Sequence, residues 1–116
     1  MAAHADVVVL GGGVIGAAIA WELARRGTAT VTVLDPRQPG SGATQASAGM
    51  LAPYSEAASG GPLLDLTVRG LETFDPFLSD LRLEVPHAEI PYTRDGLLEV
   101  AAREDGLARL ATLARE

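Results

Sequence analysis

A glycine-rich turn between an apolar run and an amphipathic stretch constrains this chain most strongly. Gly11, Gly13 and Gly16 fit the spacing G-x-G-x-x-G. In that pattern the first glycine allows a tight turn, the second lets the backbone approach a diphosphate, and the third lets a helix lie close to a sheet. The Val/Leu run at residues 6–10 precedes the turn and is typical of a strand in a buried parallel sheet. The chain is therefore expected to begin as an α/β fold.

The residues after the turn predict a helix and a second strand. From Gly13 to Arg26 apolar side chains recur at intervals of three and four, and Gly27 follows as a helix stop. Residues 30–34 alternate threonine and valine, which indicates a strand. A strand, a helix and a parallel strand join by a right-handed crossover. Residues 6–34 are therefore expected to form one Rossmann-like βαβ unit.

An acidic residue ends the second predicted strand. Asp35 lies nineteen positions after Gly16, close to the spacing at which a carboxylate binds the hydroxyl groups of an adenosine ribose. The free N–H groups at the start of the helix, with the positive end of its dipole, suit a diphosphate. These features predict a dinucleotide site, and the carboxylate disfavours a ligand of the NADP type. Asp35 could instead only form a turn before Pro36, and the pattern does not distinguish FAD from NAD.

The rest of the chain is expected to contain three helices and a strand. Residues 36–61 are rich in glycine, serine, alanine and proline, which fits either a linker or a ligand-binding segment, with a short helix over residues 43–51. An amphipathic helix opens at Pro62 and is expected to bend or restart at Pro76, with Asp75 as the cap of its second part. Residues 96–101 predict a strand, and a last helix starts near residue 103.

Two observations lead us to expect a truncated protein. The apolar stripe of the last helix still continues at Glu116, where no stop signal is present. Two parallel strands and a short third one cannot cover both faces of a doubly wound fold. The 116-residue chain alone is therefore expected to be inactive.

Composition excludes several kinds of function. The net charge of −6 opposes nucleic-acid binding, and all nine basic residues are arginine. Without cysteine there is no thiolate metal site, and His4 and His87 lie far apart in the sequence, so we expect no metal centre. The apolar stretch at residues 7–21 is too short to span a membrane and lacks a basic leader, so a cytoplasmic protein is expected.

Three stretches resemble the FAD-dependent amino-acid oxidase superfamily, which includes D-amino-acid oxidase. They are VVVLGGGVIGAAIAWELARRG at residues 7–27, VTVLD at 31–35 and GSGATQASAGMLAPYSE at 40–56. Within the third, SAGMLAP is most similar to the glycine oxidases of thiamine biosynthesis, often called ThiO. PYTRDGLLEVA at residues 91–101 resembles the first strand of their substrate domain. Sarcosine oxidases and D-amino-acid dehydrogenases remain alternatives.

The resemblance implies a set of FAD contacts, and it assigns no catalytic residue and no metal ligand in this chain. The residues that would bind FAD are the three glycines of the turn (Gly11, Gly13 and Gly16), Val14 and Ile15 under the diphosphate, Asp35 and Pro36 at the adenosine ribose, Ala43 and Thr44 at the diphosphate and ribityl chain, and Ala48, Gly49 and Met50 beside the isoalloxazine. Relatives often carry an arginine after the position of Asp35, where this chain has Ser41 and Gly42.

The resemblance also implies domains and an activity. Residues 1–84 would be the N-terminal part of an incomplete FAD domain of the glutathione-reductase type, and residues 85–116 the start of a substrate domain. The implied enzyme oxidises glycine or another small amino acid or amine through FAD, and O2 reoxidises the flavin to give H2O2. The full-length protein is compatible with a homo-oligomer. A non-catalytic module that senses NAD or an adenine nucleotide is the alternative.

Overall fold

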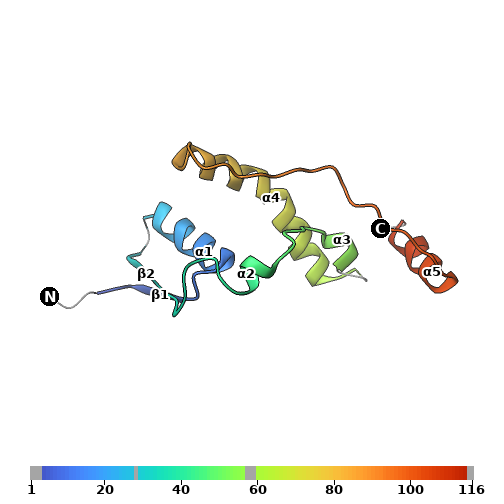
Figure 1. Cartoon of the computed structure of the whole chain (residues 1–116), viewed down its shortest axis with the longest axis horizontal. Coiled ribbons are helices and arrows are strands. Elements are labelled where there is room, and N and C mark those ends of the chain that lie inside the picture. Colours follow the sequence, from blue (N-terminus) through green and yellow to red (C-terminus); the bar gives the residue numbers. More distant parts are fainter. Residues whose placement is uncertain (1–3, 28, 57–59, 115–116) are drawn as a thin grey trace. The chain divides into compact units, whose positions relative to one another are not determined.

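The computed structural model describes residues 4–27, 29–56 and 60–114 (Figure 1). Its elements are strands β1 (Val7–Leu10) and β2 (Val31–Leu34) and helices α1 (Val14–Arg25), α2 (Ala43–Ala46), α3 (Pro53–Glu56), α4 (Pro62–Glu84) and α5 (Glu104–Leu113). The chain divides into two compact units, Met1–Met50 and Leu51–Glu116. The expected functional boundary between residues 84 and 85 stays a prediction. Glu116, where the apolar stripe continues, lies outside the described residues.

The first unit contains the expected βαβ arrangement. Strands β1 and β2 pair in parallel, from Val7 opposite Val31 to Leu10 opposite Leu34. Helix α1 connects them and contacts both strands, as Figure 1 shows. The N–H of Gly11 donates to the carbonyl of Leu34 at 2.8 Å, which extends the pairing into the turn. The predicted α/β unit is confirmed, and no observed boundary of β1, α1 or β2 differs from the expected one by more than one residue.

Two glycines make this close arrangement possible. Gly11 has a φ of 109°, a conformation that residues with a side chain rarely adopt. A Cβ atom on Gly16 would lie 1.9 Å from the carbonyl oxygen of Gly11 and 3.3 Å from Cγ1 of Val9. Helix α1 can therefore approach the end of β1 only because position 16 has no side chain, as the spacing pattern predicted.

The two-stranded sheet leaves apolar side chains exposed. On the strands, Val8 is 51% exposed, Leu10 81% and Leu34 53%. Side chains alternate between the two faces of a strand, and α1 covers the face that carries Val9. Among the described residues, Leu78 is the one large apolar side chain that is buried. This agrees with the expectation that two strands cannot bury two faces.

Helix α4 does not restart at Asp75 and Pro76, so that form of the expectation was wrong, and a bend there stays a prediction. The helix continues through Pro76 to Glu84, although an interior proline costs about 3 kcal/mol and removes one hydrogen bond. Packing on the opposite face favours continuation: the ring of Phe74 lies 5.2 Å from that of Tyr92. Asp75 caps no second helix, because its carboxylate instead accepts a hydrogen bond from the guanidinium of Arg94.

Two further segments differ from expectation. Residues 96–101 form no strand in the described chain, since no neighbouring strand is present there to pair with their backbone. Helix α2 ends at Ala46 instead of near residue 51, because Ser47 is extended and its Oγ accepts a hydrogen bond from the N–H of Gly49. Helix α3 was not expected, whereas α5 begins one residue after Arg103, as predicted.

Arg109 links α5 to α3 and to the segment that precedes α5. Nη2 of Arg109 on α5 lies 3.0 Å from Oε1 of Glu99 and donates to the carbonyl of Ser55 on α3 at 3.0 Å.

No helix within the described residues has the length and apolarity needed to cross a bilayer.

Gly16→Ala is expected to destabilise the first unit by about 1–3 kcal/mol, because the added Cβ forces the backbone of the turn to move. Gly12→Ala is the matched control, since a Cβ there would make an ordinary contact, 3.5 Å from Cβ of Asp35. Its free energy of unfolding should stay within about 1 kcal/mol of wild type. Urea denaturation of the full-length protein measures both variants. Equal midpoints would contradict the close-packing role of Gly16.

Candidate cofactor-binding site

The glycine turn is joined to the end of β2 through the carboxylate of Asp35. Oδ2 of Asp35 accepts a hydrogen bond of 2.8 Å from the N–H of Gly12, and Oδ1 accepts one of 2.8 Å from the N–H of Arg37. The loop that follows folds back on the turn, where the N–H of Gly40 donates to the carbonyl of Gly12 at 2.8 Å. The structure thus brings the predicted acidic residue directly to the predicted turn.

The environment of Asp35 favours its ionised form. The amide hydrogen bond from Gly12, and then that from Arg37, hold the pKa of this carboxyl below its ordinary value. The side chain is 12% exposed. Each carboxylate oxygen can accept more than one hydrogen bond, so Asp35 retains acceptor capacity for hydroxyl groups of a ligand such as a ribose.

Thr44 covers the start of helix α1. Its Oγ1 accepts a hydrogen bond of 2.9 Å from the N–H of Val14, the first residue of the helix. A Cβ on Gly13 would lie 2.9 Å from this oxygen, so the missing side chain makes room for the hydroxyl. The hydroxyl keeps its own proton to donate, and a phosphate oxygen could accept it. The N-terminal end of α1 and the hydroxyl of Thr44 together offer hydrogen-bond donors suited to an anion.

The remaining predicted contacts follow these residues along the chain. Ile15 is 74% exposed and lies in the first turn of α1. Ala43 begins α2, and Pro36 is an exposed residue between Asp35 and Arg37. Ala48, Gly49 and Met50 are exposed beyond α2, where Gly49 has a φ of 71°. No hydrogen bond of the described residues joins this last group to the glycine turn.

Sequence reasoning missed two contributors to the site, Gly12 and Arg37. Gly12 supplies both the N–H that binds Asp35 and the carbonyl that binds Gly40. The guanidinium of Arg37 lies beside Gly42. A Cβ atom on Gly42 would be 2.8 Å from Nη1 of Arg37. The triple glycine and an arginine two positions after Asp35 were visible in the sequence, but neither indicates its partner.

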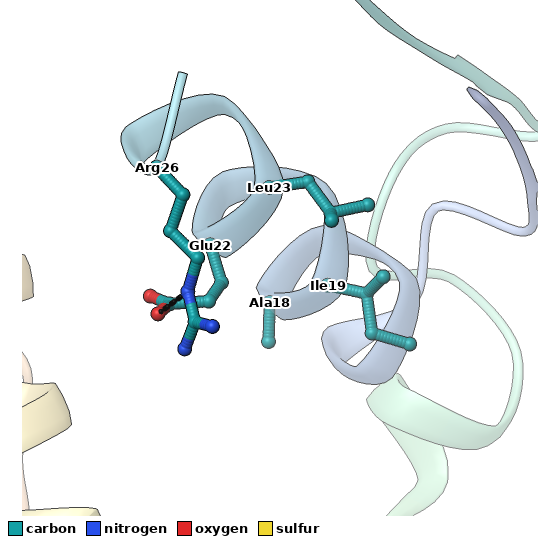
Figure 2. Close-up of a pocket in the computed structure, with 5 residues that line it drawn as sticks. All are labelled: Ala18, Ile19, Glu22, Leu23 and Arg26. Atoms are coloured by element: carbon teal, nitrogen blue, oxygen red, sulfur yellow. Dashed lines mark hydrogen bonds and ion pairs between the residues drawn. The ribbon is translucent and has the colours of Figure 1, made fainter. Parts of the chain in front are cut away.

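A separate depression lies along the C-terminal half of α1 (Figure 2). Apolar side chains of Ala18, Ile19 and Leu23 line it, together with Glu22 and Arg26. Nε of Arg26 donates to Glu22 at 2.7 Å, and this bond is the main reason that the pKa of Glu22 lies below its ordinary value. The depression runs from Ala18 toward the C-terminal end of α1 and includes none of the residues predicted to bind the cofactor, so it is not part of the candidate site.

Metal chemistry finds no support in the described part of the chain. Within residues 4–27, 29–56 and 60–114, no three His, Cys, Asp or Glu side chains are grouped so that they could hold an ion.

Asp35→Asn is expected to make the cofactor-free protein less stable at neutral pH. The folded-state pKa of Asp35 is depressed, so its contribution to stability is present above the unfolded pKa, near 4, and is lost as pH falls through the lower folded value. The difference in Tm between wild type and Asp35→Asn should therefore shrink below about pH 4. Thermal unfolding from pH 7 to pH 3 measures it, with the exposed Asp95→Asn as control. A difference that is constant with pH would contradict the assignment.

Thr44→Val is expected to lower the free energy of unfolding of the cofactor-free protein by about 1 kcal/mol, as the loss of a helix cap does. Thr44→Ser keeps the hydroxyl and should behave like wild type. Amide hydrogen exchange at Val14 reports on the bond directly, and it should speed up in the valine variant alone. Unchanged exchange in both variants would show that the hydroxyl does not protect this amide.

Comparisons with known proteins show the family to which the chain belongs. Residues 6–116 match a family model described as FAD dependent oxidoreductase. A glycine oxidase of Geobacillus kaustophilus is 38% identical over 100 residues, which are 86% of this chain and 26% of that protein. A bifunctional protein ThiO/ThiG of Synechocystis is 37% identical over 99 residues, 84% of this chain and 15% of that protein.

A hydrogen cyanide synthase subunit HcnC of Pseudomonas aeruginosa is 48% identical over 56 residues, 48% of this chain and 13% of that protein. The chain thus spans about a quarter of the length of the glycine oxidase and less of the other two. No solved structure matches the chain significantly. The family model covers nearly all of the sequence, and it bears out the resemblance and FAD as the cofactor. The chain belongs to the FAD-dependent oxidoreductase family.

Proposed function

We propose that this chain is the FAD-binding N-terminal part of an enzyme that oxidises glycine or a similar small amino acid or amine. Family membership supports the flavin chemistry, and the names of two relatives support glycine as substrate and the ThiO type of enzyme. A role in thiamine biosynthesis, in a cytoplasmic enzyme, is part of the proposal and rests on the sequence resemblance.

The observation that carries the proposal is the donor and acceptor set at the glycine turn. The ionised carboxylate of Asp35 is held beside Gly12, where it would accept hydrogen bonds from the adenosine ribose. The start of α1 and the hydroxyl of Thr44 would hold the diphosphate. The missing side chain at Gly13 leaves room for this hydroxyl. These residues fit a dinucleotide, since they offer donors to its anion and an acceptor to its sugar.

The remaining cofactor contacts are also proposals. Val14 and Ile15 would lie under the diphosphate, and Pro36 would flank the ribose. Ala43 would contact the diphosphate and ribityl region. Ala48, Gly49 and Met50 would border the isoalloxazine, where small residues let the backbone approach a flat ring. Residues 1–84 would then be part of an FAD domain of the glutathione-reductase type, and residues 85–116 would begin the substrate domain.

The proposed reaction divides the work between cofactor and protein. Bound FAD would supply the hydride acceptor, and the protein would position it. The amino acid becomes an imine, which water hydrolyses to an oxo acid and ammonia, while O2 takes up the two electrons and two protons as H2O2. The described residues would orient the dinucleotide through Asp35 and the start of α1. The catalytic groups and the substrate-binding residues are not assigned to this chain.

Two alternatives stay open within the same family. A D-amino-acid dehydrogenase would pass electrons to an acceptor other than O2, and a sarcosine oxidase would take an N-methylated amine. The NAD-sensing module is disfavoured, because the matched family is FAD-dependent.

The full-length gene product should be a yellow protein that retains FAD by mass spectrometry and releases H2O2 with glycine. Gly13→Val is the matched control, because its side chain would displace the Thr44 hydroxyl from the start of α1; it should lose FAD and activity together. A colourless protein without FAD would reject the proposal. Release of H2O2 with sarcosine or D-alanine but not with glycine would show that the enzyme oxidises a different substrate from the one proposed. Dye reduction without peroxide would indicate a dehydrogenase.

A further inference from the structure

We propose that Arg37 is an anion-binding residue of the cofactor site and that its guanidinium pairs with the diphosphate of FAD. The inference rests on the proposed function and deepens it, because it names a residue outside the set expected from the sequence. Three observations support it: the distribution of arginines in the first unit, the contacts of the Arg37 guanidinium, and the position of Arg37 in the loop between Asp35 and Thr44.

Positive charge is scarce in the first unit. Residues 1–50 contain three basic side chains of Lys or Arg type, namely Arg25, Arg26 and Arg37. Arg25 and Arg26 both bind Glu22 at the C-terminal end of α1. The helix has 12 residues, and at a rise of about 1.5 Å per residue its far end is well out of reach of an anion at its start. Arg37 is therefore the cation of this unit that lies near the glycine turn.

The guanidinium of Arg37 lies beside Asp35 and Gly42. Its backbone N–H donates to Oδ1 of Asp35 at 2.8 Å, and its Nε lies 3.8 Å from the same oxygen. A Cβ on Gly42 would lie 2.8 Å from Nη1, 3.0 Å from Nη2 and 3.2 Å from Cζ of Arg37. Gly42 also has a φ of 78°. Position 42 therefore favours glycine for its backbone, and a Cβ there would displace the guanidinium of Arg37 from its present place.

The donors of this guanidinium are still available to a ligand. The side chain of Arg37 is 62% exposed. Among the described residues no hydrogen bond is formed by its guanidinium, whose one ion pair is the long contact with Asp35. An arginine offers five N–H donors in a planar fork, which matches two oxygens of a phosphate.

The loop that contains Arg37 connects Asp35, the proposed ribose acceptor, to Thr44, one of the proposed diphosphate donors. It begins at Asp35 and reaches Thr44, whose hydroxyl binds the first amide of α1. Between them, the N–H of Gly40 ties the loop to the carbonyl of Gly12. Gly42, against which the guanidinium lies, is two residues before Thr44. The phosphates of a dinucleotide bound between Asp35 and the start of α1 would therefore lie within reach of the guanidinium of Arg37, with which they could form charge-assisted hydrogen bonds.

The test compares FAD with riboflavin, which lacks the diphosphate. In full-length protein stripped of cofactor, Arg37→Gln should raise the Kd for FAD by about tenfold or more, as expected for loss of a charge-assisted hydrogen bond. Its Kd for riboflavin should stay unchanged. The Kd for FAD should also rise less steeply with salt concentration in the variant than in wild type. Arg37→Lys should fall between the two, and Arg69→Gln, an exposed arginine of α4, is the charge-matched control.

The outcomes distinguish a failure of this inference from a failure of the proposed function. FAD uptake by wild type with an unchanged Kd in Arg37→Gln would overturn the role of Arg37 and leave the proposed function intact. Equal loss of FAD and riboflavin binding would show that Arg37 only supports the loop, and it would overturn the inference as well. If Arg37→Gln does not fold, as judged by circular dichroism, the same comparison is made with Arg37→Lys. No FAD uptake by wild type would reject the proposed function and the inference with it.

Discussion

The hydrogen bond from the N–H of Gly12 to the carboxylate of Asp35 joins the two halves of the candidate site. It connects the turn after β1 to the end of β2, next to the strand pairing that ends at Leu10 and Leu34. The bond is charge-assisted, and such bonds are stronger than bonds between neutral groups. The loop from Asp35 to Thr44 starts at this point, so the positions of the other proposed cofactor contacts depend on it.

The site combines groups that would otherwise be unsatisfied. The first amides of a helix lack partners within the helix, and in this chain the Thr44 hydroxyl meets one of them. The carboxylate of Asp35 meets two amides and stays ionised. Both groups keep hydrogen-bonding capacity after these bonds are made. Protein groups that satisfy each other and can still bind a ligand give a site that is ordered before the ligand arrives, which lowers the entropic cost of binding.

Local signals predicted the first unit well and the second unit only in part. Strand alternation, helical periodicity and glycine spacing act over short distances, so β1, α1 and β2 were predicted within about a residue of their observed bounds. The same rules allowed a bend or a restart at Pro76, and the helix does not restart there. The aromatic contact between Phe74 and Tyr92 joins residues far apart in sequence, which local rules do not foresee. Residues 96–101 have a strand-like pattern, but a strand also needs a neighbour, and a local pattern does not indicate whether one is present.

The sequence by itself determined that position 16 must be glycine, that α1 starts beside a turn and that an acidic residue ends β2, because these follow from backbone sterics and from side-chain periodicity. Only the tertiary structure decided which groups meet at the turn. Thr44 reaches the amide of Val14 across 30 positions, and Arg37 lies against Gly42 because the loop folds back on Gly12. Such contacts depend on how the chain closes in space, and the identity of the partner is not encoded in the residues next to either group.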